Sequence, residues 1–338
     1  MVRICFLSLI LTLIMCIPVT SQAGEEADRT TQIRKAIQKS IPLIETASAG
    51  SARERKCFTC HNQALAVLVF NEARQRGFKI DQSIFQLQVD HTTEHLKRGL
   101  ENYRAGKGQG GGPDTASYAL WTLELAGQKS DEVTTAVTGY LLERDKGRAH
   151  WTRNSTRPPS MSSDTNTNYF VIRALQTFGS ESQHPEITAR IAKSRQWLLD
   201  LKPASTEERV FQLRCLQTLS VDDSIQQTSI NALLKLQNAD GGWSQLPEMQ
   251  SDAYATGTVL VALLRSHLID ADEPAIRKGI QYLVDTQQAD GSWHVISHAK
   301  PFQTYFETGF PYGKDQFISV TASSWATVAL LLTQPKRD

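Results

Sequence analysis

The residues with the clearest chemical signature are two cysteines and a histidine in the segment Cys57-Phe-Thr-Cys60-His61. Two thiols at this spacing can form thioethers with the vinyl groups of a haem, and the adjacent histidine can be the proximal ligand of the iron. The motif therefore predicts haem c, with Cys57, Cys60 and His61 as its cofactor-binding residues and His61 as the metal ligand. Three alternatives remain open, namely a disulfide or redox pair with a lowered thiol pKa, a metal site, and a match without function.

A haem iron bound by His61 has a second axial position, which methionine often fills. Met161 and Met249 each stand three residues before an aspartate that opens an apolar stretch, so the spacing places both near the same end of the fold. We take either methionine as the hypothesis for the sixth ligand, against the plainer interpretation that a methionine near a loop only packs. His294 and His298, in a late loop, are alternative ligands.

Three aspartates, Asp114, Asp164 and Asp252, each open a stretch rich in alanine, threonine and apolar residues. Aspartate is a favoured N-cap that stabilises a helix by about 1 kcal/mol, so the plain interpretation is three helix caps. Parallel helices would also bring their positive N-termini to one rim. In that case the three carboxylates ring the rim of a cavity and bind a cation or a polar substrate.

The N-terminus differs in composition from the rest of the chain. Arg3 is followed by an apolar run over 4–17 and by Ser21-Gln22-Ala23, a pattern that predicts a signal peptide over 1–23. We therefore expect an exported protein, periplasmic or secreted, with no transmembrane segment after cleavage, because no later stretch has the roughly 18 apolar residues that a span requires. The 36 basic and 35 acidic residues nearly cancel, which argues against nucleic acid as a partner.

Two segments of the chain repeat one pattern, Gln237-Asn-Ala-Asp-Gly-Gly-Trp243 and Gln287-Gln-Ala-Asp-Gly-Ser-Trp293. Each follows an amphipathic stretch and precedes an apolar stretch of small residues. Six such pairs run along the chain, with amphipathic members at about 29–47, 83–104, 131–144, 186–201, 223–237 and 273–287. A helix that is apolar all round must be buried, whereas an amphipathic helix keeps a solvent face. The pattern predicts an all-α fold, a single α6/α6 toroid domain over 24–338.

The segment from Lys278 to Trp293 resembles the QW motif of squalene-hopene cyclases and related prenyltransferases, which form an α/α-toroid superfamily. The resemblance implies that the glutamine ties off a helix end, the glycine allows a tight turn and the tryptophan packs across neighbouring pairs. Gln237, Trp243, Gln287 and Trp293 are then residues of the fold and not of a catalytic site.

The catalytic motifs of that superfamily are incomplete in this chain. Its cyclases protonate their substrate through an Asp-x-Asp-Asp motif, and the nearest match, Ser220-Val-Asp222-Asp223, lacks the first carboxylate. Its protein prenyltransferases need zinc ligands within the repeats, where Cys215 is the only cysteine and is interpreted as a buried small hydrophobe. Cys60-His-Asn-Gln63 is similar to the Cys-Gly-Glu-Gln of thioester domains but lacks the glycine and the glutamate. Whether the protein is an enzyme stays open.

The combined prediction is an exported toroid that carries haem c on its rim and has a redox or ligand-binding role with an electron-transfer partner. The first alternative is a terpenoid cyclase-like or prenyltransferase-like protein that binds or modifies a hydrophobic or glycan ligand in its central cavity. The second is a non-catalytic interaction scaffold of the cell envelope. Loops over a rigid scaffold often carry binding, and the long loops are 153–163 and 301–315, the latter with Phe302, Tyr305, Phe306, Phe310 and Tyr312 as cavity lining or as loop anchors.

Overall fold

The computed structural model describes residues 20–300 and 304–337, and its regular elements are helices. The outer layer consists of α1 (Thr20–Glu54), α3 (Gln82–Arg98) with its continuation α4 (Leu100–Arg104), α6 (Glu132–Glu143), α8 (His184–Asp200), α10 (Asp223–Leu234) and α12 (Pro274–Thr286). The inner layer consists of α2 (Leu65–Gln75), preceded by the π-helical turn η1 (Cys60–Ala64), then α5 (Gly112–Leu125), α7 (Asp164–Phe178), α9 (Thr206–Thr218), α11 (Ala253–Leu264) and α13 (Gln316–Leu332). The prediction of an all-α fold is confirmed.

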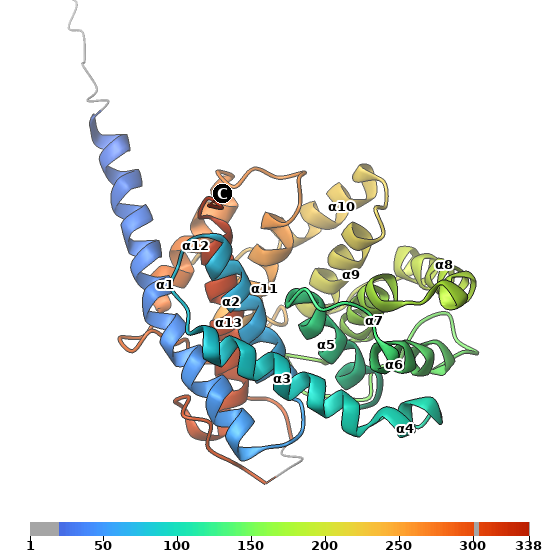
Figure 1. The fold of residues 1–338 in the computed structure, drawn as a ribbon. Coiled ribbons are helices and arrows are strands. Elements are labelled where there is room, and N and C mark those ends of the chain that lie inside the picture. Colours follow the sequence, from blue (N-terminus) through green and yellow to red (C-terminus); the bar gives the residue numbers. More distant parts are fainter. Residues whose placement is uncertain (1–19, 301–303, 338) are drawn as a thin grey trace, which may run out of the picture.

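The six inner helices close into a ring. Each contacts the next in the order α2, α5, α7, α9, α11 and α13, and α13 returns to α2. In Figure 1 the last helix, α13 in red, accordingly lies beside α1 and α2 in blue. The predicted α6/α6 toroid is therefore the observed architecture.

The two layers differ in the way that their sequences predicted. In α12 the buried residues are Ile276, Gly279, Ile280 and Leu283, a single stripe at helical spacing. In α11 every residue except Leu264 is buried, and a side chain added at Gly257 would lie 2.7 Å from the backbone nitrogen of Ala326 in α13. Small residues therefore allow the inner helices to pack closely.

The QW motifs tie each repeat to the next outer helix. Gln237 Nε2 donates to the carbonyl oxygen of Ala275 at 2.7 Å, in the first turn of α12. Gln287 Nε2 donates to that of Ala36 in α1 at 2.9 Å, which fastens the last repeat to the first helix. Gly291 has φ +95° and packs so close to α1 that a Cβ would lie 2.6 Å from the Lys39 backbone, so this turn requires glycine.

A third tryptophan repeats this geometry without the motif. The indole nitrogens of Trp243 and Trp293 donate to the carbonyl oxygens ten residues before them, and Trp151 donates in the same way to Leu141 at 2.7 Å. Arg190 of α8 lies over the Trp151 ring at 4.5 Å and donates to the carbonyl oxygens of Arg144 and Asp145. Arg190 thus links this repeat to the next outer helix. In the two later repeats a glutamine has this role.

The rim at which the inner helices end, here called the base, is closed by buried ion pairs. Glu72 at the end of α2 pairs with Arg76 and with Arg265, the latter at 2.7 Å. Glu124 of α5 pairs with Arg173 of α7. The pairs of Glu72 with Arg265 and of Glu124 with Arg173 cross between inner helices and so help to hold the ring together at this end.

The N-terminal prediction falls largely outside the described residues, since the proposed signal peptide covers 1–23 and the description starts at 20. Helix α1 is longer than the predicted 29–47 and includes residues 20–23. Within the described part of the chain, no helix combines the length and apolar character needed to cross a membrane.

Candidate functional site

The opposite rim, at which the inner helices begin, is here called the mouth, and the loop 150–163 lies across it. This loop joins α6 to α7, and Pro159, Ser160 and Met161 within it are buried. It is anchored to Asp114 of α5, to Glu207 of α9 and to Cys60 of η1. The sequence predicted a loop over 153–163 but not its three anchors in the mouth.

Asp114 holds this loop and does not cap α5. Its carboxylate accepts hydrogen bonds from the backbone nitrogens of Asn154 at 2.9 Å and Ser155 at 2.8 Å, and from Thr167 Oγ1 at 2.6 Å. The N-cap position of α5 is Gly111. Burial raises the pKa of Asp114, although these donors oppose the shift. The cap interpretation is therefore wrong for Asp114.

Asp164 is likewise not a cap, because the side chain of Ser163 caps α7. Asp164 pairs with Arg153 at 2.9 Å and lies 3.4 Å from His150. Partial burial acts to raise the pKa of Asp164, but the hydrogen bonds from His150 and Arg153 outweigh it and lower the pKa to about 2. Asp164 therefore stays ionised and fixes the start of the loop.

Asp252 is the one aspartate of the three whose side chain caps its helix. Its carboxylate accepts from the backbone nitrogen of Ala255 at 2.9 Å and from Gln245 Nε2 at 2.9 Å. Burial raises its pKa to about 6. In the described residues no group of three or more histidine, cysteine, aspartate and glutamate side chains is arranged to hold a metal ion. The expected ring of carboxylates around a cation therefore has no support.

Glu207 is the carboxyl group that the sequence analysis missed. Helix α9 begins at Thr206, and this places Glu207 in the mouth. It is buried and accepts hydrogen bonds from Ser162 Oγ at 2.6 Å and Tyr254 Oη at 3.2 Å. Burial raises the pKa of Glu207 to about 7. The capping box of Ser205 and Glu208 was the sequence signal that could have located this helix start.

Glu207 lines a mostly apolar pocket of about 290 Å³ in the mouth. The walls come from the loop 150–163, from the loop before α11 and from α11 itself, and they include Pro158, Pro159, Leu246, Met249, Tyr254 and Ala255. Met249, one of the two candidate sixth ligands, therefore lies with Glu207 and not with the cysteine motif. His298 lines this pocket too.

Cys57, Cys60, His61 and Met161 line a second pocket, of about 560 Å³. Cys60 Sγ lies 2.9 Å from Met161 Sδ and 3.9 Å from His61 Nδ1. Both cysteines are free thiols, Cys57 exposed and Cys60 buried. The structure thus brings together three of the predicted haem residues and one of the two proposed axial methionines.

The pKa of the buried thiol in this cysteine pocket argues against the redox hypothesis. Burial raises the pKa of the Cys60 thiol to about 11, whereas a reactive thiol requires a lowered pKa. Burial, together with the nearby charge of Arg157, lowers the pKa of His61 to about 3, so its imidazole is neutral at neutral pH. The Gln63 amide forms hydrogen bonds with Thr59 and Gln88, which gives the thioester alternative no support.

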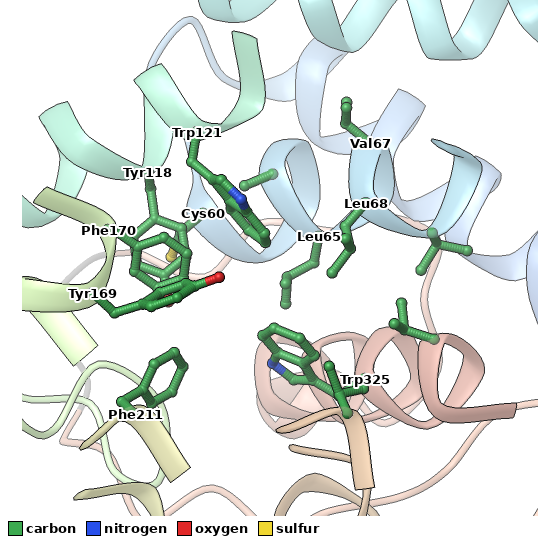
Figure 2. Close-up of a cluster of buried hydrophobic side chains, with 14 of the residues drawn as sticks. Cys60, Leu65, Val67, Leu68, Tyr118, Trp121, Tyr169, Phe170, Phe211 and Trp325 are labelled. Atoms are coloured by element: carbon green, nitrogen blue, oxygen red, sulfur yellow. The ribbon is translucent and has the colours of Figure 1, made fainter. Parts of the chain in front are cut away.

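Aromatic side chains fill the interior of the ring below the mouth. Figure 2 shows Tyr118, Trp121, Tyr169, Phe170, Phe211 and Trp325 gathered between the inner helices. The Tyr118 and Phe170 ring centroids are 3.7 Å apart, and the Tyr169 hydroxyl accepts from Arg214 at 2.7 Å. Cys215, which follows Arg214, is buried as predicted. The pockets described above lie at the mouth and not in an open central cavity.

The comparisons with known proteins match this fold. Residues 204–320 match the model of the squalene-hopene cyclase C-terminal domain. The chain is 32% identical over 111 residues to protostadienol synthase A of Arthroderma gypseum and 31% identical over 101 residues to the squalene–hopene cyclase of Bradyrhizobium diazoefficiens. These matches cover 29% and 27% of the chain, which spans only 15% and 14% of the two relatives.

A solved structure extends the likeness to most of the chain. A variant of the type II terpene cyclase MstE from Scytonema, in complex with merosterolic acid A, superposes with a TM-score of 0.59 at 10% identity, covering 91% of this chain and 99% of that one. The protein thus has the α/α-toroid fold of the terpene cyclases. The cysteine motif lies outside the segment that matches the family model.

Proposed function

We propose that this toroid binds a hydrophobic ligand of the isoprenoid class in the mouth pocket over Glu207. The observation that carries the proposal is a carboxyl group with a pKa of about 7, buried at the wall of a mostly apolar pocket. Pockets for small ligands are typically apolar, with a few polar groups that fix orientation. The terpenoid bound to MstE is consistent with this ligand class.

Glu207 has the properties of a hydrogen-bonding group for the ligand. When it is protonated, its carboxyl group can donate to a hydroxyl or carbonyl oxygen of the ligand, while the apolar walls contact the hydrocarbon part. Ser162 and Tyr254 hold the carboxyl group in place. The pocket therefore selects an apolar molecule with one oxygen function.

The same pKa favours binding over cyclisation. Protonation of an alkene needs an acid stronger than an ordinary carboxyl group, and burial makes Glu207 a weaker acid. The Ser220-Val-Asp222-Asp223 segment cannot replace it, because it joins α9 to α10 at the base. We therefore propose a binding protein and not a cyclase.

Calorimetric titration with farnesol, a neutral isoprenoid alcohol, tests this proposal. Leu246 lines the pocket and is 38% exposed, so Leu246→Arg can place a charge there without disturbing the core. Leu87 on α3 is 39% exposed, so Leu87→Arg is the matched control. We expect Leu246→Arg to weaken farnesol binding about tenfold or more, and Leu87→Arg to leave it unchanged. The absence of farnesol binding by the wild type, or equal effects of both variants, contradicts the proposal.

Haem c is the second candidate function, because Cys57, Cys60, His61 and Met161 line one pocket. The residue types are those that hold haem c: the two thiols would form thioethers, and neutral His61 would ligate the iron. Met161 could take the other axial position only after moving away from Cys60, whose sulfur lies 2.9 Å from its own. A bound haem would supply one-electron redox chemistry. Export belongs to this proposal, since the attachment takes place outside the cytoplasm. The scaffold alternative has no observation in its favour.

An absorption spectrum and a denaturing-gel haem stain test this candidate. The protein would be expressed with a haem-attachment system beside a Cys57→Ala/Cys60→Ala double variant, and the mass of the purified chain would show whether residues 1–23 are removed. A Soret band and a stain that vanish in the variant support haem c. A colourless wild type excludes it.

A further inference from the structure

We propose a further ligand site in the mouth, separate from the Glu207 pocket, that binds a small amphipathic anion with a carboxylate or phosphate head on an apolar body. It is a pocket of about 390 Å³ between η1, the start of α13 and the loop before α13. This volume lies in the range of pockets that bind one small molecule. The proposal goes beyond the ligand site proposed over Glu207 and shares no lining residue with it, whereas His61, Arg157 and Lys300 also line the cysteine pocket.

One part of this pocket is apolar. Phe317 and Val320 of α13 form it together with Phe306 and Tyr305 of the loop. His61 meets the Phe317 ring edge-on at 5.8 Å. The sequence predicted that loop aromatics would either line a cavity or anchor the loop, and the structure divides them: Tyr305 and Phe306 line the pocket, whereas Phe310 is buried as an anchor. Phe302 lies outside the described residues.

The other part of the pocket is basic. Arg157, Lys300 and Lys314 line it, against one carboxylate, that of Asp315. Asp315 is engaged, because it pairs with His294 at 3.2 Å and accepts from the backbone nitrogen of Ser297 at 3.0 Å. Neither lysine has a carboxylate within 4 Å in the part of the chain that the structure describes. The pocket therefore has an excess of positive charge at its wall, which favours an anionic ligand.

A buried amide without a partner is the second observation that points to a ligand. Asn62 is 1% exposed and lines the pocket, yet its Oδ1 atom has no hydrogen-bond partner among the described residues. Leaving a buried polar group unpaired costs stability, so such groups are rare without a functional reason. The amide can rotate to present its nitrogen as a donor. The lysines would bind the oxygens of an anionic head, the Asn62 amide would donate to it only after this rotation, and the aromatic wall would contact its chain.

Three twelve-carbon probes test the site by calorimetric titration, namely dodecanoate, dodecyl phosphate and neutral dodecanol. Lys314 is exposed, so Lys314→Gln can remove one charge without disturbing the core, and Lys129→Gln, exposed after the end of α5, is the matched control. We expect one or both anions to bind more tightly than dodecanol. Lys314→Gln should weaken that binding about fivefold to tenfold, and Lys129→Gln should not change it. Raising the salt from about 50 mM to about 500 mM should weaken it as well.

The outcomes separate the two sources of the anion and the two sites. Preference for dodecanoate indicates a carboxylate ligand, and preference for dodecyl phosphate indicates a phosphate ligand. Leu246→Arg should leave anion binding intact, so that a failure of the farnesol experiment does not affect this one. In the Leu246→Arg variant, in which the Glu207 pocket is blocked, equal affinity for dodecanol and both anions overturns the proposal, as do equal effects of the two lysine variants.

Discussion

The mouth and the base of the ring show what opposite ends of the same inner helices can do. Four carboxyl groups lie where these helices begin, namely Asp114, Asp164, Glu207 and Asp252. At the other end, Arg76 and Arg265 directly follow α2 and α11, beside the carboxylate of Glu72. The carboxyl groups at the mouth and the two arginines at the base agree with the helix dipole, which favours negative charge at N-termini and positive charge at C-termini.

The two ends differ in how these charges are satisfied. At the base, Glu72 is paired with Arg265, which follows α11, and Glu124 is paired with Arg173 of the next inner helix. At the mouth, Asp114 and Glu207 are satisfied by backbone nitrogens and hydroxyls of the loop 150–163. A loop can be displaced at lower cost than an ion pair between packed helices. The base therefore stabilises the ring, whereas the mouth is the end at which we propose ligand binding.

The largest expected effect is the loss of a base ion pair. Glu72→Ala leaves Arg76 and Arg265 without their carboxylate, and breaking a buried pair in this way costs about 3–5 kcal/mol of unfolding free energy. Glu94→Ala, in an exposed pair with Lys97, is the control and should cost less than about 0.5 kcal/mol. Urea unfolding measures both, and similar losses would show that the base is not the stabilising end.

A smaller effect is expected from the pH dependence of Glu207. The folded protein keeps this proton up to about pH 7, whereas the unfolded chain releases it near the ordinary glutamate pKa of 4.5. The unfolding free energy contributed by Glu207 is therefore complete below about pH 4.5 and is lost as the pH rises toward 7, by up to about 3 kcal/mol. Unfolding of the wild type and of Glu207→Gln at pH 5 and pH 8 measures it as a difference. His61 depends on pH in the opposite direction, because its contribution to the unfolding free energy is lost as the pH falls below about 6.5. This contribution is the same in the wild type and in the variant, so the difference between them removes it.

A still smaller effect is expected where Asp114 holds the loop. Asp114→Asn replaces a charged acceptor of two backbone hydrogen bonds by a neutral one and should cost about 1–3 kcal/mol. The loop would also open more often, so trypsin should cleave faster after the exposed Arg153. Asp90→Asn, on the exposed face of α3, is the control. Unchanged proteolysis would mean that Asp114 does not hold the loop.

Most of the fold was predictable because its signals are local. The stripe in α12 and the uniformly apolar α11 are read from successive residues, and the contrast between them assigns one helix to the outside and one to the inside. The QW motifs were recognisable for the same reason. Trp151 was not, since its place in the structure depends on Arg190, a residue of the next outer helix.

The candidate site was predictable only in part. The sequence singled out Cys57, Cys60 and His61, but it did not distinguish Met161 from Met249, and it interpreted Asp114 and Asp164 as caps. Met161 contacts Cys60 across 101 residues, and Ser162 contacts Glu207 across 45. Such contacts depend on the path of one loop across a closed ring, which no local pattern encodes.

The sequence by itself determined six helix pairs, their inner and outer members and the turns that join the later repeats, because each follows from the spacing of apolar residues, glycines and caps along a short segment. Tertiary structure alone decided which polar groups share a pocket and which carboxyl groups are protonated. The physical reason is that burial sets both, and the burial of Glu207 or His61 exists only after the ring has closed and the loop 150–163 lies across its mouth.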